Sequence, residues 1–436
     1  MPTPPRVSGL ARVLGCSLLA LGIFALAAPS ARGQAPASTA EGDLPVIDIR
    51  GAGRDLFRLA IPGAEGDAAS ANVVRGDLDV FGLFTLLDPA SFPPALQAEG
   101  LGFSSALWSQ VGAQGVAKMK VGAGQLEGRL YMLGKGEAPV LERTYKAADL
   151  RDAAHAFAND LVESLTGKKA SFGSRIAFAQ TGRSREIAAV DMDGGRTAVL
   201  THMGSDCLLP AYAPGGHEVA FTSYLRQNPD LWIVSANGGR ARRVSQHPGL
   251  NTGAAWQGDG GLLLTMSFEG NAEIYRISAA DGGIKGRLTN NPAIDSSPSP
   301  SPDGSQIAFV SNRQGSPQIF VMPSSGGTPK RLTFKGHYNQ TPRFNPSPDK
   351  SVIAFTGRDE RGIFDIFTLD LKTGQVTRVT QDQGSNSDPA WSPDGRLLVY
   401  ASSRGGLFVM NPETRHEVQI YRGGASSPSW GPVPRR

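Results

Sequence analysis

Three short strings recur in a fixed order, six times each, from residue 176 to near the C-terminal end of the chain. Typical members are IAFVS (307–311), QIFVMPSSG (318–326) and KRLTFK (330–335). A turn sequence separates the cycles and is clearest as Ser-Pro-Asp-Gly at 301–304 and 392–395. The residue at its Asp position is 215, 259, 303, 349 or 394, so successive turns are 44 to 46 residues apart. A period this constant indicates an array of equal structural units.

One cycle predicts a small antiparallel sheet. The strings are rich in Val, Ile, Phe and Tyr and have the length of strands. Ser-Pro-Asp-Gly suits a type I turn, because proline presets φ and glycine is favoured at the fourth position. Gly-Gly pairs supply the positive φ of a second hairpin. Each cycle therefore predicts four strands, and six stacked cycles predict an all-β six-bladed β-propeller.

The ends of the repeat predict how the propeller closes. The first copy begins at Ile176 with a string of the second-strand type, and the repeat ends on SPSW (427–430), which is of the first-strand type. We expect the C-terminal strand to complete the blade that begins at Ile176, which leaves no open sheet edge. A linear β-solenoid is the alternative, but it needs no complementary partial repeats.

The N-terminus has the order of a secretory signal. Arg6 and Arg12 precede an apolar run, 13–28, and small residues follow. We expect a cleaved signal peptide over 1–34, followed by an N-terminal segment over 35–44 in the exported protein. Cleavage of the signal peptide would remove Cys16 and leave Cys207 as the one cysteine, so no intramolecular disulfide is expected. No other segment is apolar enough to span a membrane.

Charge argues against nucleic-acid binding. The net charge of the whole chain is +4, and three of these positive charges come from arginines in residues 1–34, which contain no Asp or Glu. The rest of the chain is therefore nearly neutral. Lys and Arg form no cluster with interleaved aromatic residues. We therefore expect no nucleic-acid partner.

Residues 45–167 do not repeat and predict an N-terminal α/β domain. Strands are expected at 45–50, 118–122, 128–134 and 139–145. A helix over 149–167 has an apolar stripe and ends at Gly167, and a shorter helix is expected over 70–80 with Ser70 as its cap. A linker over 168–175 then leads into the propeller, 176–432.

Motifs for catalysis are missing from the sequence. It has no G-x-S-x-G, H-E-x-x-H or Walker sequence. The six histidines are scattered, and AVDMDGG (189–195) fits a hairpin turn better than a calcium loop. We expect no catalytic residue, no metal and no cofactor.

A propeller without catalytic residues offers its channel mouth for binding. The residues at the start of each innermost strand should gather there, and most are small and polar. We expect them to hydrogen-bond an inserted polypeptide; polar turn residues without a binding role are the alternative. The candidates are Asp206, Asn251, Thr252, Asp295, Ser296, Asn339, Gln340, Thr341, Asn386, Ser387 and Asp388.

Three sequences together resemble the TolB family of the Tol-Pal system. They are LLDPASFPP (86–94), the junction at 153–180 and the P-x-W-S-P-D-G repeats. The resemblance implies a monomeric, non-enzymatic periplasmic protein with an α/β domain on a six-bladed propeller. It implies that the channel mouth binds the peptidoglycan-associated lipoprotein Pal and that the N-terminal segment binds TolA. It also implies roles in outer-membrane integrity and in constriction at cell division.

An exported propeller has two alternative functions. A peptidase of the prolyl-oligopeptidase type needs a large hydrolase domain with a nucleophile elbow, for which the sequence leaves no room. A propeller that binds a sugar or lipid ligand would need aromatic platforms, and few aromatic residues fall at the expected rim.

Overall fold

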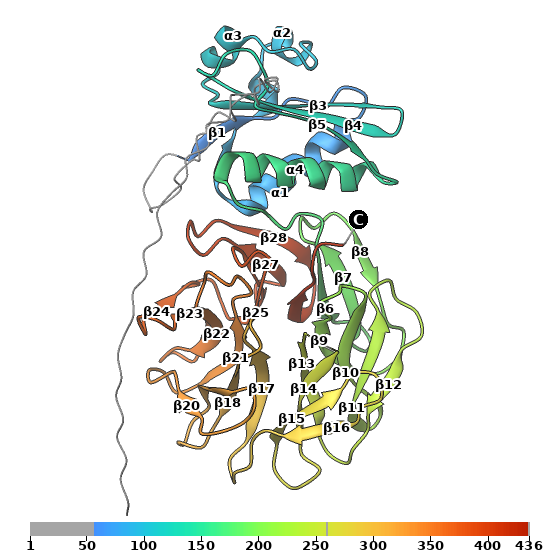
Figure 1. Cartoon of the computed structure of the whole chain (residues 1–436), viewed down its shortest axis with the longest axis vertical. Coiled ribbons are helices and arrows are strands. Elements are labelled where there is room, and N and C mark those ends of the chain that lie inside the picture. The colour runs from blue at the N-terminus through green and yellow to red at the C-terminus, as the bar shows by residue number, and fades with distance from the viewer. Residues whose placement is uncertain (1–55, 259, 435–436) are drawn as a thin grey trace, which may run out of the picture. The chain divides into compact units, whose positions relative to one another are not determined.

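A computed structural model describes residues 56–258 and 260–434 (Figure 1). The strand expected at 45–50 and the segments 1–34 and 35–44 lie outside the described residues. The described residues belong to one compact unit. They form a five-stranded mixed sheet with helices, followed by six four-stranded sheets. The expected fold class, an α/β domain followed by a six-bladed propeller, is confirmed.

The α/β domain is built on a sheet with the strand order β2-β1-β3-β4-β5. Strand β1 runs parallel to β2 and β3, and the β3-β4-β5 part is antiparallel. The strands are β1 (Phe57–Ala60), β2 (Phe84–Leu86), β3 (Gly115–Gly122), β4 (Gln125–Met132) and β5 (Leu141–Lys146). The helices are α1 (Ala68–Phe81), η1 (Pro89–Ser91), α2 (Pro94–Gln97), α3 (Ser105–Gln110) and α4 (Leu150–Thr166).

The two long helices lie against the sheet and begin and end as their sequences dictate. Asp149 caps α4 by accepting the N–H of Arg151, and Gly167 ends it in the left-handed conformation that glycine adopts without strain. The predicted cap of α1 was wrong. Asp67, not Ser70, is the N-cap and accepts the N–H groups of Ala69 and Ser70. Both residues suit a cap, and the aspartate lies at the position that faces the free N–H groups.

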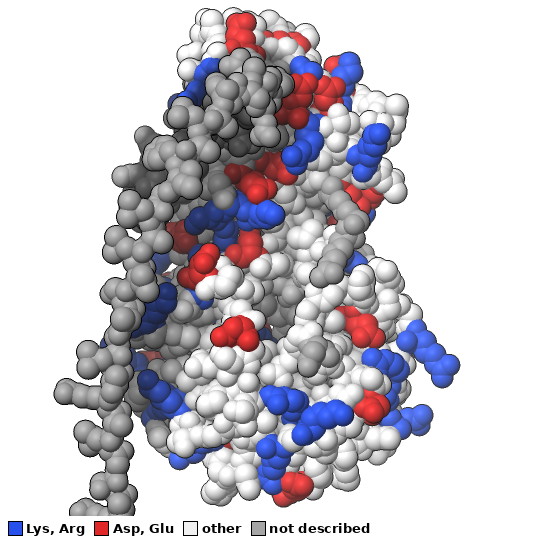
Figure 2. Space-filling model, in the orientation of Figure 1, with Lys and Arg blue, Asp and Glu red and all other residues white. Residues whose placement is uncertain are grey.

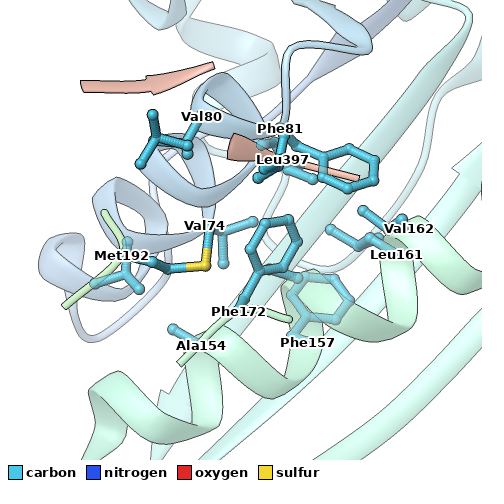
Figure 3. Close-up of a cluster of buried hydrophobic side chains, with 14 of the residues drawn as sticks. Val74, Val80, Phe81, Ala154, Phe157, Leu161, Val162, Phe172, Met192 and Leu397 are labelled. Atoms are coloured by element: carbon cyan, nitrogen blue, oxygen red, sulfur yellow. The ribbon is translucent and has the colours of Figure 1, made fainter. Parts of the chain in front are cut away.

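The core of the α/β domain continues into the propeller. Figure 3 shows Phe172 close to Phe157 and Val74, with Met192 and Leu397 of the propeller in the same cluster. Phe172 also meets Phe81 edge to face, with 5.6 Å between ring centroids. Burial of this apolar surface stabilises the two parts together.

Six four-stranded blades make up the propeller, and strand order within each blade runs from the axis outwards. Five are continuous: β9–β12 (Cys207–Tyr212, Glu218–Arg226, Asn228–Ser235, Arg242–Ser245), β13–β16 (Asn251–Gln257, Gly261–Met266, Glu273–Ser278, Ile284–Arg287), β17–β20 (Asp295–Pro300, Gln306–Ser311, Gln318–Pro323, Lys330–Arg331), β21–β24 (Asn339–Phe344, Val352–Arg358, Phe364–Asp370, Val376–Arg378) and β25–β28 (Asn386–Trp391, Leu398–Ser402, Gly406–Met410, Glu417–Arg422).

The sixth blade closes the ring as the sequence predicted. Its order is β29-β6-β7-β8, with β29 (Ala425–Trp430) from the C-terminal end and β6 (Arg175–Gln180), β7 (Glu186–Asp191) and β8 (Thr197–Val199) from the start. Trp430 of β29 pairs with Ile176 of β6 in antiparallel register.

A buried threonine explains the Leu-Thr of the third repeated string. In one blade, Thr333 donates to the side-chain oxygen of Gln318 at 2.7 Å and accepts the N–H of Ile319 at 3.0 Å. The same arrangement ties Thr201 to Glu186, Thr289 to Glu273 and Thr380 to Asp365. Each threonine therefore satisfies a buried backbone donor and fixes the outer strand of its blade to the third strand.

Each innermost strand carries a β-bulge. The third residue of the strand has a positive φ in all six blades, and five of the six are not glycine: Leu209, Gly253, Ser297, Thr341, Asp388 and Ser427. The pairing with the second strand shifts at the same place. A left-handed non-glycine residue costs free energy, so its recurrence around the ring marks a conformation imposed by the packing of the blades.

Candidate functional site: the free rim of the propeller

The strand directions give the propeller two different ends. At one end lie the turns after the innermost strands and the outer hairpins, and this end meets the α/β domain. Asp394 N–H donates to Ser171 Oγ at 3.0 Å, and Asn411 Nδ2 donates to the carbonyl of Phe81 at 2.9 Å. At the other end lie the crossovers between blades and the hairpins between second and third strands. We call this second end the rim; all the candidates predicted from sequence lie on it.

Four of the predicted site residues are buried at the rim and hold its loops. Asn251, Asp295, Asn339 and Asn386 each begin an innermost strand and are at most 3% exposed. Asn339 donates to the carbonyl of Lys335 at 2.9 Å, and Asn251 donates to that of His247 at 2.6 Å. Asn386 donates in the same way to the carbonyl of Gly384 in its own loop. The carboxylate of Asp295 accepts hydrogen bonds from the side chains of Asn291 and Arg313. Their side chains shape the crossovers rather than present hydrogen-bonding groups to a partner.

The other seven predicted residues keep partial exposure: Asp206, Thr252, Ser296, Gln340, Thr341, Ser387 and Asp388. The side chain of Asp206 is 46% exposed and accepts the N–H of Arg185 at 3.0 Å. Thr341 shares a 2.8 Å hydrogen bond with Thr356. The structure thus brings the predicted residues together at one end, and these seven remain the candidates for partner contact.

Sequence reasoning missed the apolar component of the rim. Phe334 is 74% exposed and Ile294 is 52% exposed, and both lie in crossover loops. Tyr224 and Leu225 are exposed on the β10–β11 hairpin at the same end. A usable signal was present in the sequence, since these are large apolar residues inside otherwise polar loops. Apolar residues among polar neighbours are typical of a protein-binding surface.

The propeller axis holds a separated pair of opposite charges. Burial lowers the pKa of Arg343 on β21, and the nearby Asp388 partly offsets this effect. Burial raises the pKa of Asp388 on β25, although Arg343 and a hydrogen bond from Ser427 oppose the change. Both residues nevertheless keep partial exposure. Deeply enclosed yet accessible groups of this kind mark a polar interior around the axis.

A second polar cluster lies where α1, α4 and the β7–β8 hairpin meet. His155 Nδ1 lies 2.7 Å from Asp77 Oδ2, and both side chains are almost fully buried. Asp193 of the hairpin has a carboxylate oxygen within 4.8 Å of both, so the three could be read as metal ligands. The His155–Asp77 contact is a hydrogen bond, however, and Arg151 already pairs with Asp193. The cluster therefore fits a bound proton better than a metal ion.

The hairpin AVDMDGG also forms as expected, and its acids have a structural role. Asp191 lies 3.3 Å from Arg151 of α4 and 2.8 Å from Arg196, while Asp193 also pairs with Arg151. Arg196 in turn lies 2.7 Å from Asp149, the N-cap of α4. These ion pairs connect the propeller to the helix that precedes it.

A hollow of about 840 Å³ in the α/β domain is lined by residues that include Glu65, Arg75, Phe92, Leu96 and Glu99. No helix among the described residues is long and apolar enough to cross a membrane. Basic and acidic side chains are interspersed on the face seen in Figure 2.

The fold and the rim define a class: a six-bladed β-propeller that follows an α/β domain and leaves one end free for binding. Family models agree in both parts, with the TolB amino-terminal domain matching residues 45–132 and the TolB β-propeller domain matching residues 162–434. The chain belongs to the TolB family.

Individual relatives support this assignment. The Tol-Pal system protein TolB of Anaeromyxobacter dehalogenans strain 2CP-C is 38% identical over 389 residues, covering 85% of this chain and 89% of that protein. A TolB homolog of Chlorobium luteolum is 35% identical over 254 residues and matches 57% of its own length. The crystal structure of TolB from Acinetobacter baumannii superposes with a TM-score of 0.77 at 26% identity, covering 87% of this chain and 97% of that one.

Proposed function

We propose that this protein is a non-enzymatic, periplasmic binding component of the Tol-Pal system. In this role its rim binds the peptidoglycan-associated lipoprotein Pal and its N-terminal segment, 35–44, binds TolA. The complex would support outer-membrane integrity and envelope constriction at cell division. Membership of the TolB family supports the proposal, since curated relatives are named as Tol-Pal system proteins.

The observation that carries the rim assignment is the combination of exposed apolar and polar groups at the free end. Phe334 and Ile294 offer apolar anchors of the kind that dominate protein interfaces. The accessible polar residues Asp206, Thr252, Ser296, Gln340, Thr341, Ser387 and Asp388 surround the axis and can form directional hydrogen bonds around an anchor.

The rim is also well suited to act as a rigid platform. Buried Asn251, Asn339 and Asn386 fix its crossovers from inside, and Asp295 is held by Arg313 at 2.7 Å. A preorganised surface loses little conformational freedom on binding, which favours affinity.

Two purified partners test the proposal. Calorimetry of the mature protein with the Pal domain of the same organism should show 1:1 binding, and a second titration should show binding of TolA. Deletion of residues 35–44 should abolish TolA binding and preserve the 1:1 stoichiometry with Pal. If neither partner binds either form, the proposal fails, and sugar and lipid ligands become the next to test.

A further inference from the structure

Arg343 breaks the pattern of the innermost strands. The fifth residue of each innermost strand is small in the other five blades: Ala211, Ala255, Ser299, Ala390 and Ser429. At this position Ser299 accepts the N–H of Phe344, and Ser429 accepts the N–H of Tyr212, so the position faces the next blade close to the axis. Five small residues leave room there for the one long cationic side chain.

The guanidinium of Arg343 is largely unused by the protein. Among the described residues its only recorded hydrogen bond is from Nη1 to the carbonyl of Pro342, at 3.0 Å. A guanidinium has five N–H donors. Asp388 is near enough to act on its charge but forms no ion pair with it. Arg343 therefore keeps several free donors in an enclosed and solvent-accessible place, deeper along the axis than Asp388.

The loops of the rim carry an excess of free positive charge. Four exposed cations have no acidic partner among the described residues: Arg183, Arg226, Lys335 and Arg422. The rim acids are mostly neutralised, since Arg185 pairs with Asp206 and Arg361 pairs with Asp359 and Asp382. Among the acids of the rim loops, Glu360 is exposed without a recorded cation. Free cations around the mouth attract an anionic partner and raise its rate of association.

We infer that the occupant of the rim is an acidic polypeptide segment that inserts a side-chain carboxylate along the axis to Arg343. A guanidinium binds a carboxylate through two parallel N–H···O bonds, which gives direction as well as attraction. Asp388, at a shallower level, can accept a backbone N–H of the same segment. Its negative charge also disfavours a dianion such as phosphate. The inference rests on the proposed function and names the chemistry that the rim selects.

A double-mutant cycle tests the carboxylate contact. The Pal domain is titrated by calorimetry into the wild-type protein and into Arg343→Gln, first unchanged and then with each exposed Asp or Glu replaced by its amide. Arg343→Gln should weaken binding at least tenfold, and one amide variant of Pal should bind both proteins equally. An affinity for the Pal domain that is the same in Arg343→Gln as in the wild type would overturn the inference. It would also be overturned if, for every amide variant of Pal, the loss of affinity simply added to the loss caused by Arg343→Gln.

Control variants separate the contact from general charge effects. Arg240→Gln removes an exposed cation from the outer hairpin of a blade, at the end away from the rim, and should bind as the wild type does. Arg343→Lys keeps the charge without the paired donors and should recover only part of the affinity. Equal thermal unfolding of the variants would show that they fold. A full recovery by lysine would contradict the directional contact.

Two further titrations separate failure of the inference from failure of the proposed function. If the Pal domain does not bind, a glutamate-rich peptide and its glutamine counterpart replace it as probes. Binding of the glutamate peptide alone, lost in Arg343→Gln, would support the inference without Pal, and binding of neither would overturn it. Titration with succinate tests whether the bound carboxylate belongs to a small molecule instead of a polypeptide. If succinate saturates the site and competes with the peptide, the assignment of a polypeptide is overturned.

Discussion

Trp430 donates its indole N–H to the hydroxyl of Ser174 at 2.8 Å, which joins the last strand of the propeller to the residue just before its first. Both side chains are buried, and Ser174 Oγ in turn donates to the carbonyl of Ser171 at 2.7 Å. The ring is therefore closed by a hydrogen bond and by packing, in addition to the pairing of β29 with β6.

Replacement of Trp430 by alanine should destabilise the whole propeller. Loss of a buried tryptophan costs about 3–5 kcal/mol, because a cavity replaces its ring. Urea unfolding followed by circular dichroism would measure the change. Trp430→Phe keeps most of the packing and loses the hydrogen bond, so it should cost less than the alanine variant. A loss below about 1 kcal/mol in Trp430→Ala would contradict closure through this strand.

Thr333→Val should destabilise one blade from its outer side. The substitution leaves the buried N–H of Ile319 without its acceptor, which costs about 1–3 kcal/mol. Thr377→Val on the exposed face of β24 is the matched control and should change the free energy of unfolding by less than about 0.5 kcal/mol. Equal stability of the two variants would show that the repeated threonine is not a structural tie.

These two predictions show why the architecture was readable from the sequence. A strand such as IAFVS must bury its side chains against a neighbouring blade. Because similar strands recur about every 44 residues, the same packing is required all around the ring. The complementary ends at 176–180 and 427–430 gave the closure as well. The cap of α1 could not be decided in the same way, because Asp67 and Ser70 both suit the position and only the path of the chain chooses between them.

The composition of the rim was harder to predict for a physical reason. A polar residue in a crossover can form hydrogen bonds either to a partner or within its own loop. Sequence does not show which of these applies to Asn339, which is buried, and to Gln340, which is partly exposed. Arg343 was missed because its role depends on five small residues in other blades. The pairing of His155 with Asp77 becomes visible only when α1 and α4 are packed together.

The free energy of unfolding should fall as pH rises, because His155 is buried against acids. Burial lowers the pKa of His155, but its hydrogen bond with Asp77 and the charge of Asp193 outweigh this and raise it above 6.5, although Arg151 opposes them. Burial also raises the pKa of Asp77 to about 6. The folded state therefore binds more protons than the unfolded state. The stabilisation by His155 is complete below pH 6.5 and is lost as pH rises through its raised pKa.

Urea unfolding between pH 6 and pH 9 would measure this dependence. His155→Gln should flatten it, whereas His202→Gln, at an exposed position of the rim, should leave it as in the wild type. A stability that rises with pH in the wild type, or the same slope in His155→Gln, would contradict the predicted protonation.

Arg151→Ala should weaken the connection between α4 and the propeller. The substitution leaves Asp191 and Asp193 buried without this cation, and breaking a buried ion pair costs about 3–5 kcal/mol. Arg143→Ala breaks an exposed pair with Asp160 and should cost less than about 1 kcal/mol. Thermal unfolding together with proteolysis at the junction would compare the two, and equal effects would contradict a structural role for Arg151.

Calorimetry of rim variants tests most directly whether the free rim is the partner-binding surface. Phe334→Asp and Ile294→Asp place a charge on the rim, whereas Val376→Asp places one at a similarly exposed apolar position on the outer strand of a blade. We expect both rim variants to lose at least tenfold in affinity for the Pal domain and Val376→Asp to bind as the wild type does. Wild-type affinity in the rim variants, or a loss in Val376→Asp alone, would contradict this expectation.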